Sequence, residues 1–261
     1  MVIAAFGLWV LAVPVVLVVR DWPETVGLHP DGDAAPPGAG AGEGSPGSGQ
    51  QDERGFTVRE VLHMRTFWLL VTAFAFWNVA HGVQPHMFVA LTSAPMSPER
   101  AALIIALIAG LDLAGRLGFG FLSDYVDNRR LLSLCSVTAA VGLVFLAVLV
   151  VEYSHAAWLA VPFVGFYAIG LGGSFPMRVL IVGRFFGRQH FGPVFAALLA
   201  LSSWGGLIGP VFVGWAFDLT DSYFTAFTTC SVLLFLSAPL ILLAANPQLA
   251  KHPSQTTSPA E

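Results

Sequence analysis

Long runs of apolar residues, interrupted by short polar segments, make up most of the chain. Seven runs are long enough to cross a bilayer, since its hydrocarbon core of roughly 30 Å needs about 20 apolar residues in a helix. We place them at 1–19, 65–90, 99–121, 131–151, 156–182, 191–217 and 222–246. The pattern predicts an all-α, polytopic membrane protein.

A polar segment, residues 20–64, separates the first run from the other six. Its part at 31–55 is rich in Gly, Pro, Ala and Ser. Such a sequence buries too little apolar surface to offset the entropy of ordering. We therefore expect a disordered stretch at 31–55 within a linker, then a six-helix bundle over 65–246 and a tail at 247–261.

Composition and the placement of cations refine this picture. Hydrophobic residues make up 56% of the chain and charged residues 11%, whereas a soluble domain carries about 25% charged residues. If the linker is cytoplasmic, the outer side of the membrane holds only Arg100. The cytoplasmic side then holds nearly all the remaining cations. Those are Arg20, Arg54, Arg59, Arg65, Arg129, Arg130, Arg184, Arg188 and Lys251. This bias predicts a cytoplasmic linker and tail.

The six later runs contain a weak internal repeat. Residues 101–124 and 195–218 align without gaps, and both segments end in Gly-x-x-x-Asp. With three helices per unit, the second unit must be inverted relative to the first. Inverted three-helix repeats are typical of secondary transporters, although Gly-rich apolar helices also align by chance.

Two charged residues interrupt the apolar run at 99–121. Asp112 and Arg116 are four residues apart, so they share one helix face and can pair. A charge at membrane depth costs on the order of 3 kcal/mol on insertion scales and often marks a pathway or a partner. The pair is either a functional site or a permanent ion pair that orients the helix. Arg178, in the run at 156–182, is explained equally by snorkelling to the cytoplasmic surface and by anion contact.

Further polar residues lie in the run at 65–90. Asn78, His81 and Gln84 recur every three residues, so they could line a cavity, or else form hydrogen bonds between helices. Gly82 and Pro85 are possible kink points. No His, Cys or acidic cluster has metal-ligand spacing, and no nucleotide-binding or hydrolase motif occurs. We therefore expect no metal, no cofactor, no nucleic-acid partner and no enzymatic activity.

The segment GFLSDYVDNRR, residues 120–130, resembles the loop motif G-x-L-a-D-r-x-G-r-R/K of the major facilitator superfamily. The matching residues, with a second arginine after them, are Gly120, Leu122, Asp124, Arg129 and Arg130. Tyr125 replaces the usual basic residue, and Asp127-Asn128 stands around the expected glycine. Because Asn and Asp tolerate the left-handed conformation, the turn is expected to survive.

Four more segments resemble the branch of bacterial monocarboxylate and oxalate/formate transporter-like proteins. They are RDWPETVGLHPDG, QPHMFVALTSAPMSPERAA, GRFFGRQHFG and IGPVFVGWAFDLTDSYFTAF. In this register the run at 1–19 corresponds to the family's sixth helix and the other six to its seventh through twelfth. The resemblance thus implies a truncated chain that lacks helices one to five.

The resemblance also implies a function. A complete protein of this kind has two six-helix bundles and moves a small organic anion, here a monocarboxylate, with a proton by alternating access. By this resemblance, Arg116 would bind the substrate carboxylate and Asp112 would exchange the proton. From their own spacing, Asn78, His81 and Gln84 are candidates for further substrate contacts. The expected location is the bacterial inner membrane. The alternatives are an inactive half-transporter relic, a membrane scaffold or receptor, and an intramembrane enzyme.

Overall fold

The computed structural model describes residues 55–187 and 189–247, and within these ranges every regular element is a helix. The run expected at 1–19, the stretch at 31–54 and most of the tail lie outside the described residues. The helices are α2 (Val58–Val61), α3 (Arg65–His81), α4 (Val83–Ser93), α5 (Pro98–Leu122), α6 (Asn128–Val151), α7 (Tyr153–Ala156), η3 (Ala157–Leu159), α8 (Ala160–Phe186), α9 (Phe191–Ser202), α10 (Trp204–Thr220) and α11 (Phe224–Leu243).

Six segments of the described chain are long and apolar enough to cross a membrane. They are 65–93, 98–122, 128–151, 153–186, 191–220 and 224–243. The predicted class, an all-α polytopic membrane protein, is confirmed. The last span ends at Leu243 rather than at the expected 246, and the fifth continues to Thr220 rather than stopping at 217.

Polar caps fix the start of two spans. Ser97 accepts a hydrogen bond from the backbone N–H of Arg100 at 3.4 Å, and Pro98 occupies the first position of α5. Asp127 accepts from the N–H of Arg129 at 2.9 Å and caps α6. Both arrangements satisfy donors that a helix leaves free at its N-terminus.

Three of the six spans contain more than one helix: the fourth begins with the short α7 and η3 before α8, and two others are broken further along. The first divides at Gly82 into α3 and α4, and Pro85 is tolerated because it lies in the first turn of α4. The fifth span divides at Ser203 into α9 and α10. The breaks meet: the Asn78 amide donates to the carbonyl of Ser202 at 2.9 Å, and a Cβ on Gly82 would collide with the backbone of Gly209.

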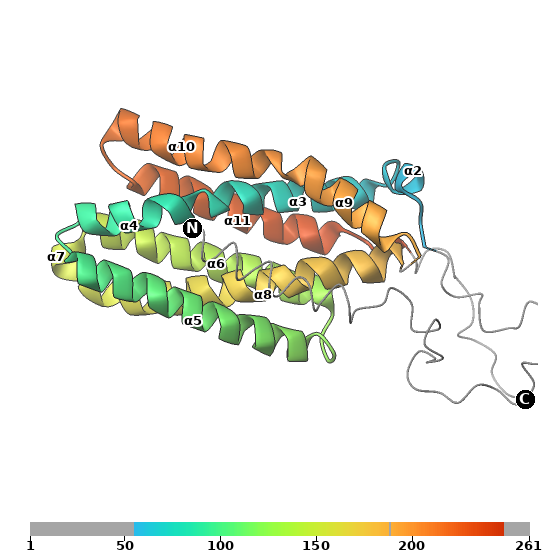
Figure 1. Ribbon diagram of the computed structural model, residues 1–261, viewed down its shortest axis with the longest axis horizontal. Helices are drawn as coiled ribbons and strands as arrows, with labels where there is room; N and C mark the ends of the chain where they lie inside the picture. Colours follow the sequence, from blue (N-terminus) through green and yellow to red (C-terminus); the bar gives the residue numbers. More distant parts are fainter. Residues whose placement is uncertain (1–54, 188, 248–261) are drawn as a thin grey trace, which may run out of the picture. The chain divides into compact units, whose positions relative to one another are not determined.

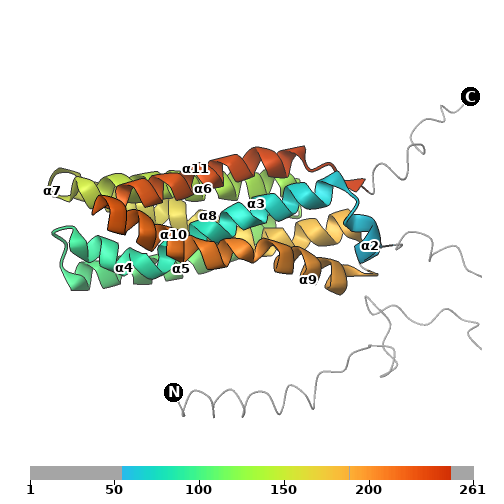
Figure 2. The same cartoon turned by 90° about the horizontal axis from the view of Figure 1, so that it is seen from above.

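The helices form one bundle in which α6 packs against α8 and α11, α5 packs against α8, and α3 packs against α10 and α11. In Figure 1, α5 and α10 form the two outer edges of this bundle. Figure 2 shows α6 and α11 side by side along their length. Only 22% of the apolar part of α5 and 28% of that of α9–α10 are buried, against 44–50% in the other four spans. These two spans therefore keep an open face.

The end of the expected linker is structured. Thr57 and Glu60 form a capping box at the start of α2, and the backbone N–H of Phe56 donates to the carbonyl of Phe186 at 2.9 Å. Residues 55–64, which the sequence placed in the linker, are thus attached to the C-terminal end of α8.

Candidate functional site

The ion pair expected from the spacing on α5 is present. Nη2 of Arg116 lies 2.8 Å from Oδ2 of Asp112, and the Arg116 side chain is 48% exposed while that of Asp112 is 14% exposed. The second carboxylate oxygen of Asp112 is buried and has no hydrogen-bond partner among the described residues. The pair therefore combines an accessible guanidinium with a carboxylate that is only half satisfied.

The backbone of α5 rests directly on that of α8. A Cβ on Gly172 would collide with the carbonyl oxygen of Asp112, and a Cβ on Gly115 would lie 2.9 Å from the carbonyl oxygen of Ile169. Glycines at both positions permit this approach, as small residues commonly do between membrane helices. The approach sets the position of Asp112 and Arg116 relative to the side chains of α8.

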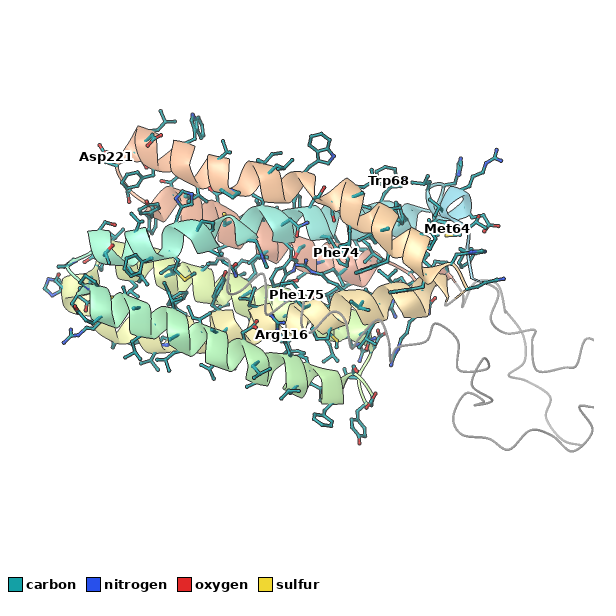
Figure 3. All side chains as sticks on the ribbon, viewed as in Figure 1. Met64, Trp68, Phe74, Arg116, Phe175 and Asp221 are labelled. Carbon is teal, nitrogen blue, oxygen red and sulfur yellow. The ribbon has the colours of Figure 1, made fainter. Side chains whose placement is uncertain are left out.

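Phe175 of α8 connects the ion pair to the interior of the bundle. The guanidinium carbon of Arg116 lies 4.9 Å from the centre of the Phe175 ring, and Phe175 is 41% exposed. The imidazole of His81, on α3, lies 5.8 Å from the same ring, edge to face. Figure 3 shows Arg116 and Phe175 together in the middle of the bundle, with Phe74 close by. Helices α3, α5 and α8 thus meet at one polar cluster.

A second arginine belongs to this cluster. Arg178 is only 7% exposed, and its guanidinium carbon lies 4.9 Å from the ring of Trp77, 5.2 Å from that of Phe74 and 5.8 Å from that of Phe175. Nε and Nη2 of Arg178 are buried without a hydrogen-bond partner in the described part of the chain. The snorkelling interpretation of Arg178 is therefore wrong: its guanidinium points into the bundle.

The aromatic contacts of Arg178 do not offset the cost of burying its charge. A cation–π contact contributes about 0.5–2 kcal/mol, and three rings share one guanidinium here. The effective penalty for burying an ion in a protein is still several kcal/mol, in addition to the cost of N–H groups left unsatisfied. Within the described residues, Arg116 and Arg129 form the ion pairs with carboxylates, and Arg178 forms none. Arg178 is thus a buried positive charge that lacks a counter-charge there.

The rings around Arg178 are held in place by their neighbours. The indole N–H of Trp77 donates to Oγ of Ser136 on α6 at 2.8 Å. Phe74 and Trp77 are one turn apart on α3, and both are almost completely buried. The sequence does not reveal this cage, because Arg178 lies about one hundred residues from the two α3 aromatics. The signal available in the sequence is one arginine within an apolar run.

The three polar residues expected on one cavity face make different contacts. Asn78 makes the hydrogen bond to Ser202 described above, which is the interhelical alternative. His81 faces the cluster, and its Nε2 is buried without a partner among the described residues. Gln84 is exposed and contacts the phenol of Tyr167. Only His81 is therefore placed beside the Phe175 ring.

The loop between α5 and α6 carries the expected motif. Asp124 and Arg130 are exposed, whereas Arg129 forms an ion pair with Asp127 at 2.9 Å. The hydrogen bonds from Arg129 hold the pKa of Asp127 below its ordinary value. The guanidinium of Arg184, near the end of α8, donates to the carbonyl of Ser123 at 3.1 Å. The loop is thereby tied to α8.

The turn in this loop is not built as the motif suggests. Asp127 has φ of −57°, and among the described non-glycine residues only Asp221 has a positive φ. The left-handed residue that a glycine would supply is thus absent from the described loop, and Asp127 instead serves as the N-cap of α6. Gly120 has open space around it, since no atom of the described chain lies within 4 Å of its Cβ position.

These features define an all-helical, multi-pass membrane protein with a polar cluster in mid-bundle, and comparison with known proteins gives its family. Residues 69–260 match the Major Facilitator Superfamily, so the chain belongs to that family.

The chain is also similar to curated members of the family. Monocarboxylate transporter 12 from Xenopus laevis is 28% identical over 205 residues, which cover 74% of this chain and 44% of that protein. The protein of the same name from Rattus norvegicus is 26% identical over 204 residues, or 76% of this chain and 40% of that one. Monocarboxylate transporter 9 from Gallus gallus is 27% identical over 153 residues, or 55% and 28%. The chain spans less than half the length of these relatives.

Proposed function

We propose that the chain is part of a secondary active transporter that moves a small monocarboxylate together with a proton by alternating access. The observation that carries the proposal is the Asp112–Arg116 pair, which offers an accessible guanidinium within a membrane-length helix. The names of the similar transporters support a monocarboxylate as the substrate class.

Each residue of the cluster has a distinct role in this proposal. The planar, permanently charged fork of Arg116 binds the substrate carboxylate in bidentate fashion. Asp112 takes up the proton that moves with the substrate. Arg178 and His81 are the other charged or titratable groups around the shared Phe175 ring. His81 adds a hydrogen bond to the substrate, while Asn78 and Gln84 contribute through the helices they join.

The complete transporter in this proposal has five more helices, which come before the run at 1–19 and cover the open face of α5. Its location is the bacterial inner membrane. The DNA upstream of Met1 tests this part of the proposal directly: an in-frame sequence that encodes five apolar spans supports it, and an in-frame stop codon close to Met1 contradicts it.

The transport activity is tested in proteoliposomes that contain the protein from the longest reading frame including this chain. Uptake of labelled pyruvate is measured with and without an inwardly directed proton gradient. We expect uptake above that of empty liposomes, accelerated by the gradient and competed by unlabelled lactate. Saturable binding without uptake would instead indicate a receptor or an inactive relic.

Membrane topology gives a separate prediction. Single cysteines at Ser48, Gln189 and Ser254 should react with a membrane-impermeant thiol reagent only from the cytoplasm, because the cation bias places these positions inside. Cysteines at Ser97 and Ser154 should react only from outside. The measurement uses intact cells and inside-out vesicles of a variant with Cys135 and Cys230 replaced by serine. Labelling of positions 48 and 97 from the same side would contradict the proposed orientation.

The loop motif predicts an effect on rate rather than on affinity. Asp124→Asn should slow transport several-fold and leave the KM for pyruvate nearly unchanged, because the exposed carboxylate lies at the end of α5, away from the polar cluster. We propose that Asp124 biases the balance between the two access states. The variant Asp221→Asn, which removes an exposed acid in the α10–α11 turn, is the matched control. A large rise in KM with normal maximal rate would refute this role.

A further inference from the structure

The polar cluster contains more positive charge than one ion pair can neutralise. Asp112 and Arg116 compensate each other at 2.8 Å, and Arg178 adds a further charge near the Phe175 ring. The guanidinium carbons of Arg116 and Arg178 lie 4.9 Å and 5.8 Å from that ring's centre. The two guanidinium carbons are therefore no further apart than the sum of these distances, so both belong to one cluster around Phe175.

Nearby acidic residues of the sequence do not supply the missing charge. The run at 1–19 contains no Asp or Glu. Between 65 and 93 the sequence also has none, and on α8 none occurs between 160 and 186. On α5, Asp112 is already committed to Arg116. Among the described residues the buried N–H groups of Arg178 thus have no carboxylate partner, which matches a ligand that carries its own negative charge.

We propose that Arg178 is a second carboxylate-binding group, and that with Arg116 it selects a substrate carrying a single negative charge. This inference rests on the proposed function, because it assigns a further residue and a charge class to the same site. When Asp112 is ionised, Asp112, Arg116 and Arg178 together carry one net positive charge, which one carboxylate neutralises. A dicarboxylate would leave a net negative charge in a low-dielectric site, which is unfavourable.

The unpaired state of Arg178 also distinguishes a binding role from a structural one. If Arg178 serves to bind a ligand, its removal takes away an uncompensated buried charge. The ligand-free protein should then become more stable, because residues of functional sites often lower the stability of the fold. If Arg178 instead joins α8 to α3 through its aromatic contacts, the same removal should make the protein less stable. The sign of the change in Tm therefore separates the two roles.

The test uses the protein from the longest reading frame containing this chain, purified in lipid nanodiscs. Binding of pyruvate and of succinate is followed by the change in tryptophan fluorescence, since Trp77 touches Arg178. The variant Trp77→Phe shows how much of the fluorescence change comes from Trp77. Tm is measured with and without pyruvate. The variants are Arg178→Met, Arg178→Lys and, as a matched control on the same helix, Arg184→Gln.

We expect Arg178→Met to weaken pyruvate binding at least tenfold, to raise the Tm of the ligand-free protein and to abolish its rise with pyruvate. Arg178→Lys should keep part of the affinity, Arg184→Gln should bind as the wild type does, and succinate should bind more weakly than pyruvate. The inference is overturned if Arg178→Met binds pyruvate normally, if both Arg178 variants lower the Tm or fail to fold, or if succinate binds more tightly. A wild-type protein that binds neither acid would overturn the proposed function itself.

Discussion

Replacing Arg116 by alanine is expected to weaken carboxylate binding by roughly 30-fold or more, because truncating one partner of a hydrogen-bonded charge pair costs about 2–5 kcal/mol. The change removes the accessible fork and leaves Asp112 without its partner on α5. Uptake and counterflow exchange should both fall with binding. Arg100→Ala is the matched control, because it removes an arginine near the start of the same helix.

Asp112→Asn should affect a different step of transport from Arg116→Ala. The amide keeps the volume of the carboxyl group but cannot titrate. Proton-driven accumulation of pyruvate should therefore vanish, while exchange of internal for external pyruvate persists. The measurements are binding, net uptake and exchange, each normalised to the amount of folded protein in the membrane.

A purely structural ion pair predicts another pattern. Both single variants would then lose folded protein, and a double variant with two apolar residues would recover it, as replaced buried ion pairs often do. We expect instead that Asp112→Leu/Arg116→Met gives folded protein without transport. Normal transport by this double variant would contradict the assignment of the pair as the site.

The second large effect is expected from Gly172→Ala. Its new methyl group would collide with the carbonyl oxygen of Asp112 and approach the backbone nitrogen of Arg116 to 3.1 Å. Because backbone atoms cannot yield as a flexible side chain does, α5 must move away from α8. Overpacking of this kind costs about 1–3 kcal/mol, and the movement displaces both charged residues from Phe175. We expect a lower Tm and a loss of carboxylate binding together.

Gly165→Ala is the control, because this glycine is on the same helix and no atom of the described chain lies within 4 Å of its Cβ position. In a helix, alanine is favoured over glycine by up to about 1 kcal/mol, so Gly165→Ala should leave the Tm unchanged or raise it. If Gly172→Ala behaves like Gly165→Ala in both Tm and binding, the direct α5–α8 contact does not position the site.

Local sequence patterns predicted those features that depend on one segment alone. The apolar runs indicated the membrane-length helices, because the length of a span follows from the thickness of the bilayer. The spacing of Asp112 and Arg116 indicated their pairing, because residues four apart share a helix face. The sequence marks Gly82 as a possible kink point, and the helix does break there.

Features that depend on packing between distant segments were not predictable in the same way. The surroundings of Arg178 come from Phe74 and Trp77 on another helix, and no pattern around residue 178 encodes them. Asn78, His81 and Gln84 have a regular spacing, but the break at Gly82 and the contact with α9 separate their environments. The break at Ser203 was missed because apolar residues continue on both sides of it.

The contact between the two broken helices limits how they can move. A Cβ on Gly205 or Gly209 would collide with the carbonyl oxygen of Ala75 or Val79, respectively, so α10 lies backbone to backbone on α3. A shift along the axis by one residue, about 1.5 Å, would bring the side chains of neighbouring residues into the space of these glycines. Translation along the axis is therefore opposed, whereas tilting about the contact is not opposed in this way. Because both breaks lie at this contact, a change in tilt on one side of the membrane can take place without repacking the other.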